Sequence, residues 1–164
     1  MTSRTLVALR VGAAPQRVFE VFTREIGQWW QPNGLFQFTR GRQGALAFEP
    51  RAGGRFTETY SDGEVFEIGT VRVWEPPARL VFTWRQAGFA PDQQTEVHVR
   101  FEAVADQTRV TVEHFGWDAL PQDHVARHDF PLPVFQRRLA EWWQRLLAAL
   151  SARTAQASQT HRAP

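Results

Sequence analysis

The chain has 164 residues, of which 43% are hydrophobic, and its 19 basic and 17 acidic side chains leave a net charge of +2. This length predicts one domain with a substantial core. The absence of cysteine excludes disulfides, thiol catalysis and thiolate metal sites, and it fits a reducing compartment. Because the sequence contains neither a secretory signal nor an apolar run of about 20 residues, we expect a cytoplasmic protein without a membrane span.

The isoelectric point of about 10.3 resembles that of a nucleic-acid-binding protein. All of the basic residues are arginines, however, and the high pKa of arginine raises the isoelectric point without a large positive excess at pH 7. The arginines are spread along the chain and form no basic run. We therefore expect no nucleic-acid partner.

Three elements are predicted in the first 32 residues. Alternation of apolar and polar residues over 5–11 predicts a first strand. Pro15 suits the first turn of a helix, in which Val18, Phe19 and Phe22 share one face. A second short helix, containing Trp29 and Trp30, is predicted before Pro32.

From residue 44 the hydrophobic period changes to two, which predicts about six antiparallel strands joined by hairpins. Asp62-Gly63, between two strand-like runs, is typical of a hairpin turn. Alternation places Glu58 and Tyr60 on the same face as Phe56. The inward residues of the last three strands are predicted to be Leu80, Phe82, Trp84, Val97, Val99, Phe101, Val110, Val112 and His114.

After Pro133 the period becomes 3.6, which predicts an amphipathic helix of about 18 residues. Its apolar stripe is Phe135, Leu139, Trp142, Trp143, Leu146, Leu147 and Leu150. Residues 151–164 offer nothing larger than alanine to bury, so we expect a single domain over 1–150 and a flexible tail over 151–164.

These elements predict an α+β protein. An antiparallel sheet with one apolar face must cover that face, and the C-terminal helix is the only long helix available. We expect a curved sheet of about seven strands wrapped around this helix, with two short helices after the first strand.

Several segments resemble a known family. "GTVRVWEPPARLVFTWR" (69–85) and "TEVHVRFEAVADQTRVTVEHFGW" (95–117) resemble the bacterial family named after the heat-shock-protein-90 ATPase activator, in the SRPBCC superfamily with its START-like, helix-grip fold. "PQRVFEVFTREIGQWWQP" and "GGRFTE" also fit, so that the resemblance covers about residues 5–150.

The resemblance implies a cavity between sheet and long helix for an apolar or amphipathic small molecule, and it supplies no universal catalytic motif. The superfamily also includes polyketide cyclases, aromatases and lipid carriers. The activator function of the family's namesake resides partly in a separate N-terminal domain that is absent from this sequence. The family name therefore is not taken as the function, because a fold does not determine one.

Two tryptophan pairs, Trp29-Trp30 and Trp142-Trp143, are candidates either for the core or for the wall of a cavity. At adjacent helical positions, only one member of each pair is expected to point fully inward. Both interpretations remain open from the sequence.

Glu58, Tyr60 and His114 are polar residues on the predicted inward face, where each needs a partner. They either satisfy one another or serve as a ligand anchor or an acid–base group. His124 and His128 have the spacing of two helical metal ligands, but no third ligand is evident, and a solvated loop is the simpler interpretation. We expect no metal and no cofactor.

The leading functional hypothesis is a non-catalytic protein that binds a hydrophobic small molecule, with no catalytic residues and with oligomeric state, including a homodimer, left open. The expected ligand-binding residues are Trp30, Glu58, Tyr60, Phe82, Trp84, His114, Trp142 and Trp143. One alternative is a cyclase- or hydrolase-like enzyme of the polyketide cyclase type that uses His114 with Glu58 or Tyr60. Another is a co-chaperone or protein-interaction module.

Overall fold

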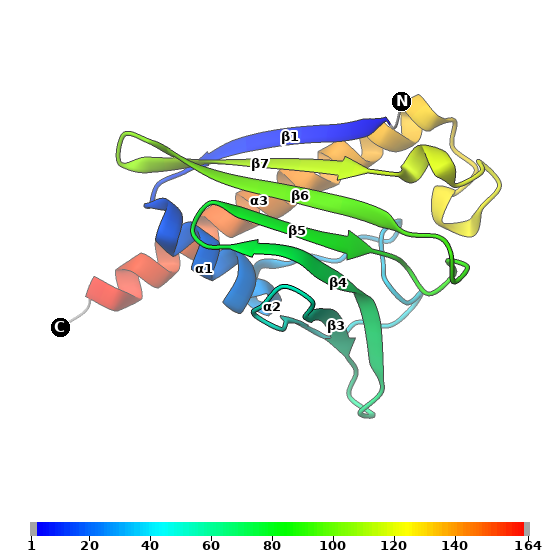
Figure 1. Cartoon of the computed structure of the whole chain (residues 1–164), viewed down its shortest axis with the longest axis horizontal. Coiled ribbons are helices and arrows are strands. Elements are labelled where there is room, and N and C mark those ends of the chain that lie inside the picture. Colours follow the sequence, from blue (N-terminus) through cyan, green and yellow to red (C-terminus); the bar gives the residue numbers. More distant parts are fainter. Residues whose placement is uncertain (1–2, 163–164) are drawn as a thin grey trace.

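One curved antiparallel sheet and one long helix dominate the structure (Figure 1), a computed structural model that describes residues 3–162 and the side chains of residues 3–156. The seven strands are ordered β1-β7-β6-β5-β4-β3-β2. They are β1 (Arg4–Val11), β2 (Ala45–Phe48), β3 (Arg55–Thr59), β4 (Val65–Glu75), β5 (Arg79–Trp84), β6 (Thr95–Val104) and β7 (Gln107–Phe115). The predicted helix-grip architecture is confirmed.

The helices lie against one face of this sheet. The long helix α3 (Leu132–Arg162) runs along the sheet, and α1 (Pro15–Arg24) and α2 (Ile26–Trp29) lie near one end of it (Figure 1). Two single-turn helices, η1 (Trp117–Ala119) and η2 (Val125–Arg127), lie between β7 and α3. Within the described range, no helix combines the length and the hydropathy that crossing a membrane requires.

The strand register explains why the predicted inward face is buried. Val99 lies opposite Leu80 on β5 and Val112 on β7, and His114 lies opposite Val97. Side chains that pair in this way project to the same face of the sheet. All of the predicted inward residues of β5, β6 and β7, and the whole predicted stripe of α3, are buried in the structure.

Helix α3 is longer than the sequence indicated. The apolar stripe ends at Leu150, but the helix continues to Arg162, because no glycine or proline interrupts the helix-forming residues that follow. Thr154 is 1% exposed, and Arg153 forms an ion pair of 2.9 Å with Glu25. The flexible tail over 151–164 stays a prediction.

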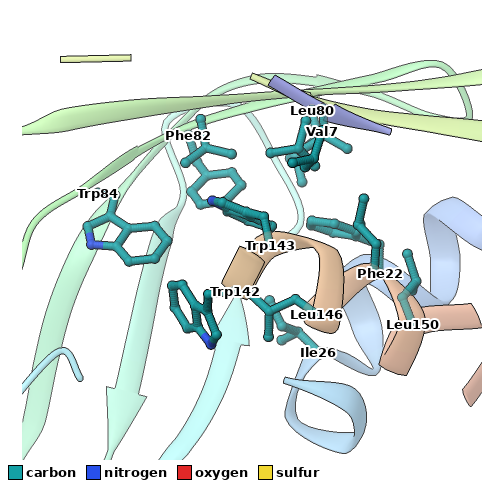
Figure 2. Close-up of a cluster of buried hydrophobic side chains, with 14 of the residues drawn as sticks. Val7, Phe22, Ile26, Leu80, Phe82, Trp84, Trp142, Trp143, Leu146 and Leu150 are labelled. Atoms are coloured by element: carbon teal, nitrogen blue, oxygen red, sulfur yellow. The ribbon is translucent and has the colours of Figure 1, made fainter. Parts of the chain in front are cut away.

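The second tryptophan pair corrects the expectation that only one of two adjacent tryptophans points inward. Trp142 is 2% exposed and Trp143 is fully buried. The two indoles leave α3 in different directions, with Trp143 toward the sheet (Figure 2). Trp142 instead stacks on Phe36, with ring centroids 4.9 Å apart, and donates to the carbonyl of Gln31 over 3.0 Å. Both are buried because the helix is covered on one side by the sheet and on another by the chain after α2.

Candidate ligand-binding site

Trp30 stands at the centre of an aromatic cluster between α3 and the sheet. Its ring centroid is 5.4 Å from that of Trp142, 5.6 Å from that of Trp143 and 5.9 Å from that of Trp84. It also stacks on Phe38 at 5.9 Å. Trp30 is half-buried, whereas its four neighbours are buried. Aromatic rings therefore fill much of the space between sheet and helix at this end.

A small cavity adjoins this cluster. It lies between the connecting loop of residues 30–44 and strands β2 and β3, and its volume is about 50 Å³. Its lining includes Trp30, Phe38, Gly44, Leu46 and Glu58. Since a water molecule occupies about 30 Å³ and drug-sized ligands need roughly 300 Å³ or more, the cavity in this conformation has room for water only.

Glu58 brings a carboxylate to the wall of this cavity. The residue is 5% exposed, and its Oε1 accepts a hydrogen bond of 2.6 Å from the hydroxyl of Tyr60. Its Oε2 accepts one of 3.1 Å from the backbone N–H of Gly44. No described cation pairs with Glu58, because the neighbouring Arg42 is engaged by two exposed carboxylates, those of Asp62 at 2.9 Å and Glu64 at 2.6 Å.

Tyr60 links Glu58 to the connecting loop. Its hydroxyl is 2.6 Å from Oε1 of Glu58 and 2.6 Å from Oγ1 of Thr39. Because a phenol has one proton and Glu58 accepts it, the Thr39 hydroxyl supplies the proton of the second bond. Burial, together with the hydrogen bond to Glu58, raises the pKa of Tyr60 to about 12. The phenol is thus held in its protonated form.

His114 lies deeper in the core and is not among the residues that line the cavity. It is 1% exposed. The indole N–H of Trp143 points at Nδ1 over 3.1 Å, and Nε2 lies 2.8 Å from the hydroxyl of Thr95 and 3.1 Å from the indole nitrogen of Trp117. Burial lowers the pKa of His114 to about 3, so the ring is neutral at pH 7.

The predicted site residues thus fall into two groups. Trp30 and Glu58 line the cavity, and Tyr60 contacts Glu58. The others form the buried core behind Trp30, and they are Phe82, Trp84, His114, Trp142 and Trp143. Participation of either group in ligand binding stays a prediction.

A family model described as Activator of Hsp90 ATPase homolog 1-like protein matches residues 12–154. The chain belongs to this family. None of the curated proteins matches it. Among solved structures, protein MLL2253 from Mesorhizobium loti is 20% identical with a TM-score of 0.62, over 92% of this chain and 95% of that one.

Two further solved structures are similar to this chain. DynU16, a protein in the dynemicin biosynthetic locus, is 21% identical with a TM-score of 0.62, over 91% of this chain and 46% of that one. Txn09, an anthrahydroquino-gamma-pyrone synthase solved in complex with SUM, is 30% identical with a TM-score of 0.53, over 89% of this chain and 96% of that one. The first likeness shows the fold alone.

Sequence reasoning missed the contribution of the connecting loop. Residues 30–44 have no regular hydrophobic period, yet Phe36, Phe38 and Arg42 from this loop line the cavity. A signal that could have been used is Gly44, where a Cβ atom would meet the carbonyl oxygen of Thr59 at 2.4 Å. Only glycine lets the backbone approach so closely, and this approach brings its N–H to Glu58.

The two histidines with metal-ligand spacing have other partners. His124 Nδ1 accepts from the backbone N–H of Ala126 over 3.0 Å, and His128 Nε2 lies 2.6 Å from the carbonyl oxygen of Leu35. Among the described residues, no cluster of three or more histidine, cysteine or acidic side chains could hold a metal ion. The two rings instead tie loops together.

Proposed function

We propose that this protein binds a planar apolar or amphipathic small molecule that carries an O–H or N–H group, between the sheet, the connecting loop and α3. The single observation that carries the proposal is the buried carboxylate of Glu58 at an aromatic-lined cavity, without a cationic partner among the described residues. Ligand pockets typically combine such an apolar wall with a few polar groups that orient the ligand.

The chemistry of Glu58 favours a hydrogen-bond donor on the ligand. A carboxylate can accept about four hydrogen bonds, and Glu58 accepts two, from Tyr60 and from Gly44. A ligand hydroxyl can add a third, while its rings stack on Trp30. A fatty acid is less suitable, because its own carboxylate would repel Glu58 in a site of low dielectric constant.

Binding of a ligand of this size requires the connecting loop to move. The cavity of about 50 Å³ must enlarge several-fold, and residues 30–44 contain neither helix nor strand. Displacement of Trp30 would expose the faces of the core residues behind it. In this proposal Phe82, Trp84, His114, Trp142 and Trp143 form the inner wall of the enlarged cavity.

A second candidate function is ring closure. It is favoured by the 30% identity to Txn09, an anthrahydroquino-gamma-pyrone synthase. Closure of a γ-pyrone adds a hydroxyl oxygen to a ketone carbon and then releases water. In the addition, Glu58 would take the proton of the attacking hydroxyl and the protonated Tyr60 would donate its proton to the ketone oxygen. In the dehydration, Glu58 would return its proton to that oxygen as it leaves as water, and the Tyr60 phenolate would take the hydrogen of the adjacent carbon, which forms the ring double bond and restores both residues.

Titration of the tryptophan fluorescence with two probes tests the binding proposal. We expect 2,6-dihydroxyanthraquinone, a planar phenol whose hydroxyls are free to donate, to quench emission saturably with one equivalent bound, and myristate to bind at least tenfold more weakly. Absence of any saturable response to either probe contradicts the proposal, and tighter binding of myristate favours a lipid carrier. Mass spectrometry of solvent extracts from natively purified protein would then identify the natural ligand class.

The catalytic candidate needs a separate assay. 1-(2-Hydroxyphenyl)butane-1,3-dione closes to 2-methylchromone with loss of one water, which absorbance spectra record. Acceleration by the wild-type protein that Glu58→Gln abolishes supports an enzyme. Binding of the dione without acceleration supports a carrier.

A further inference from the structure

A second concavity lies beside the connecting loop, outside the cavity described above. Its volume is about 310 Å³, within the range of small-molecule sites. Its walls come from the connecting loop, from the segment after β5 and from η2. The lining of the groove includes the side chains of Leu35, Phe38, Arg40, Gln86, Val125 and His128.

We propose that this groove is a second binding site, for an amphipathic anion with a planar apolar body and an N–H or O–H donor. It is distinct from the Glu58 cavity, with which it shares only Gln37 and Phe38 as lining residues. The proposal therefore does not depend on what binds beside Glu58.

Hydrogen bonds preform the groove by fastening its three walls to one another. They are Ala87 N–H to the Phe38 carbonyl at 2.7 Å, Gln86 Nε2 to the Gln37 carbonyl at 2.6 Å, and His128 Nε2 to the Leu35 carbonyl at 2.6 Å. A ligand thus meets a surface that already has its bound shape, which reduces the entropic cost of binding.

Gln86 supplies the polar feature that points to a ligand. The residue is 7% exposed and lines the groove. Its Nε2 donates to the Gln37 carbonyl, so a flipped amide would oppose two carbonyl oxygens, and Oε1 must be the other atom. This Oε1 is buried without a hydrogen-bond partner among the described residues. Buried acceptors are rarely left unpaired, and a small rotation of the Gln86 amide toward the groove would let a ligand donor supply the partner.

The charge of the groove selects an anion. Arg40 is exposed, forms no ion pair with any other described residue, and no aspartate or glutamate lines the groove. The groove also has an apolar wall, since its lining residue Val125 is 58% exposed although it is a large hydrophobic residue. The lining therefore fits a ligand with three features. These are an anionic group near Arg40, a flat body against Val125 and Phe38, and a hydrogen-bond donor at Gln86.

The test uses 6-anilinonaphthalene-2-sulfonate, which has a sulfonate, two aromatic units and an anilino N–H that is remote from the sulfonate and free to donate. We expect one saturable site whose fluorescence rises on binding, and at least a fivefold weaker affinity in each of Val125→Asp, Arg40→Gln and Gln86→Leu. Matched controls are Val65→Asp, at a valine that is 53% exposed elsewhere, and Arg24→Gln, at an exposed arginine of α1. Both controls should bind as the wild type does.

Circular dichroism establishes that each variant is folded, and amide NMR shifts locate the probe. We expect the largest shifts at Ala87 and Gly88. The proposal would be overturned if Val125→Asp and Arg40→Gln bound the probe as tightly as the wild type does. It would also be overturned if the two controls lost as much affinity as these variants, or if no saturable binding occurred. Glu58→Gln should leave the affinity for this probe unchanged, so failure of this site and failure of the Glu58 site are distinguishable.

Discussion

The indole N–H of Trp143 points at Nδ1 of His114 over 3.1 Å, which joins α3 to β7 inside the core. A neutral imidazole accepts through one nitrogen and donates through the other. Nε2 lies 3.1 Å from the indole N–H of Trp117 and 2.8 Å from the hydroxyl of Thr95, and that hydroxyl donates to the carbonyl of Trp84 at 3.1 Å. One buried chain of hydrogen bonds therefore links α3, β7, β6 and β5.

Replacement of His114 by phenylalanine should break this chain while keeping the ring volume. The indole N–H groups of Trp143 and Trp117 then lose a buried acceptor, and each such loss costs about 1–3 kcal/mol. We expect the free energy of unfolding to fall by about 2–4 kcal/mol, measured by urea denaturation. Affinity for 2,6-dihydroxyanthraquinone should be unchanged if Glu58 alone is the anchor, whereas a tenfold loss in the folded variant would assign His114 to the ligand site.

The same residue predicts a pH dependence of stability. The pKa of His114 is about 3 in the folded state, because of burial, against 6.5 for the free side chain. Between these values the unfolded chain binds a proton that the folded chain does not, so stability is fully present above about pH 6.5 and falls as the pH drops. One proton corresponds to about 1.4 kcal/mol per pH unit. We therefore measure the free energy of unfolding by urea denaturation between pH 7 and pH 4 for the wild type and for His114→Phe. This free energy should fall less steeply with decreasing pH in His114→Phe, by up to this amount per pH unit. Parallel curves for the two proteins would refute a lowered pKa of His114.

Trp84 provides a test of the core. It is fully buried between Trp30, Phe38 and His114, and its indole nitrogen has no hydrogen-bond partner among the described residues. Trp84→Ala should cost on the order of 3–5 kcal/mol. Trp84→Phe should lower the free energy of unfolding clearly less than Trp84→Ala does, because it keeps an aromatic ring and removes the unpaired indole donor. A loss below about 1 kcal/mol for the alanine variant would mean that the packing described here is wrong.

Truncation of α3 tests the tail predicted from composition. Removal of residues 157–164 should leave the melting temperature unchanged. Removal of 151–164 also deletes the Arg153–Glu25 ion pair and the buried Thr154, and we expect a loss of about 1 kcal/mol, since exposed ion pairs contribute at most about that much. A near-zero change for both would favour the flexible tail, and a loss above about 3 kcal/mol for the shorter deletion would contradict both expectations.

The sheet could be predicted from the sequence because each strand has one buried face. Alternation alone placed Phe82, Val99 and His114 inward, and the register confirms it. The end of α3 could not be predicted from the apolar stripe, since helix formation beyond Leu150 depends on backbone propensity and on Arg153 reaching Glu25.

The candidate site was only partly predictable for a related reason. Glu58 lies in β3 and Tyr60 directly follows that strand, so alternation still applies, and both are buried as expected. Thr39 and Arg42 belong to a loop without a period, so nothing local indicated that they would approach Tyr60. Such contacts depend on tertiary packing, which sequence patterns of short range do not encode.

The measurement that tests the central claim most directly is the affinity of Glu58→Gln for 2,6-dihydroxyanthraquinone, by isothermal titration calorimetry beside the wild type. Glutamine keeps the size of the side chain but replaces one acceptor oxygen by a donor. The control is Glu102→Gln, which alters an exposed carboxylate on β6 that does not line the cavity. We expect the dissociation constant to rise about tenfold in Glu58→Gln, which corresponds to about 1.4 kcal/mol, and to stay unchanged in the control. Wild-type affinity in a folded Glu58→Gln variant would contradict the claim that this buried carboxylate anchors the ligand.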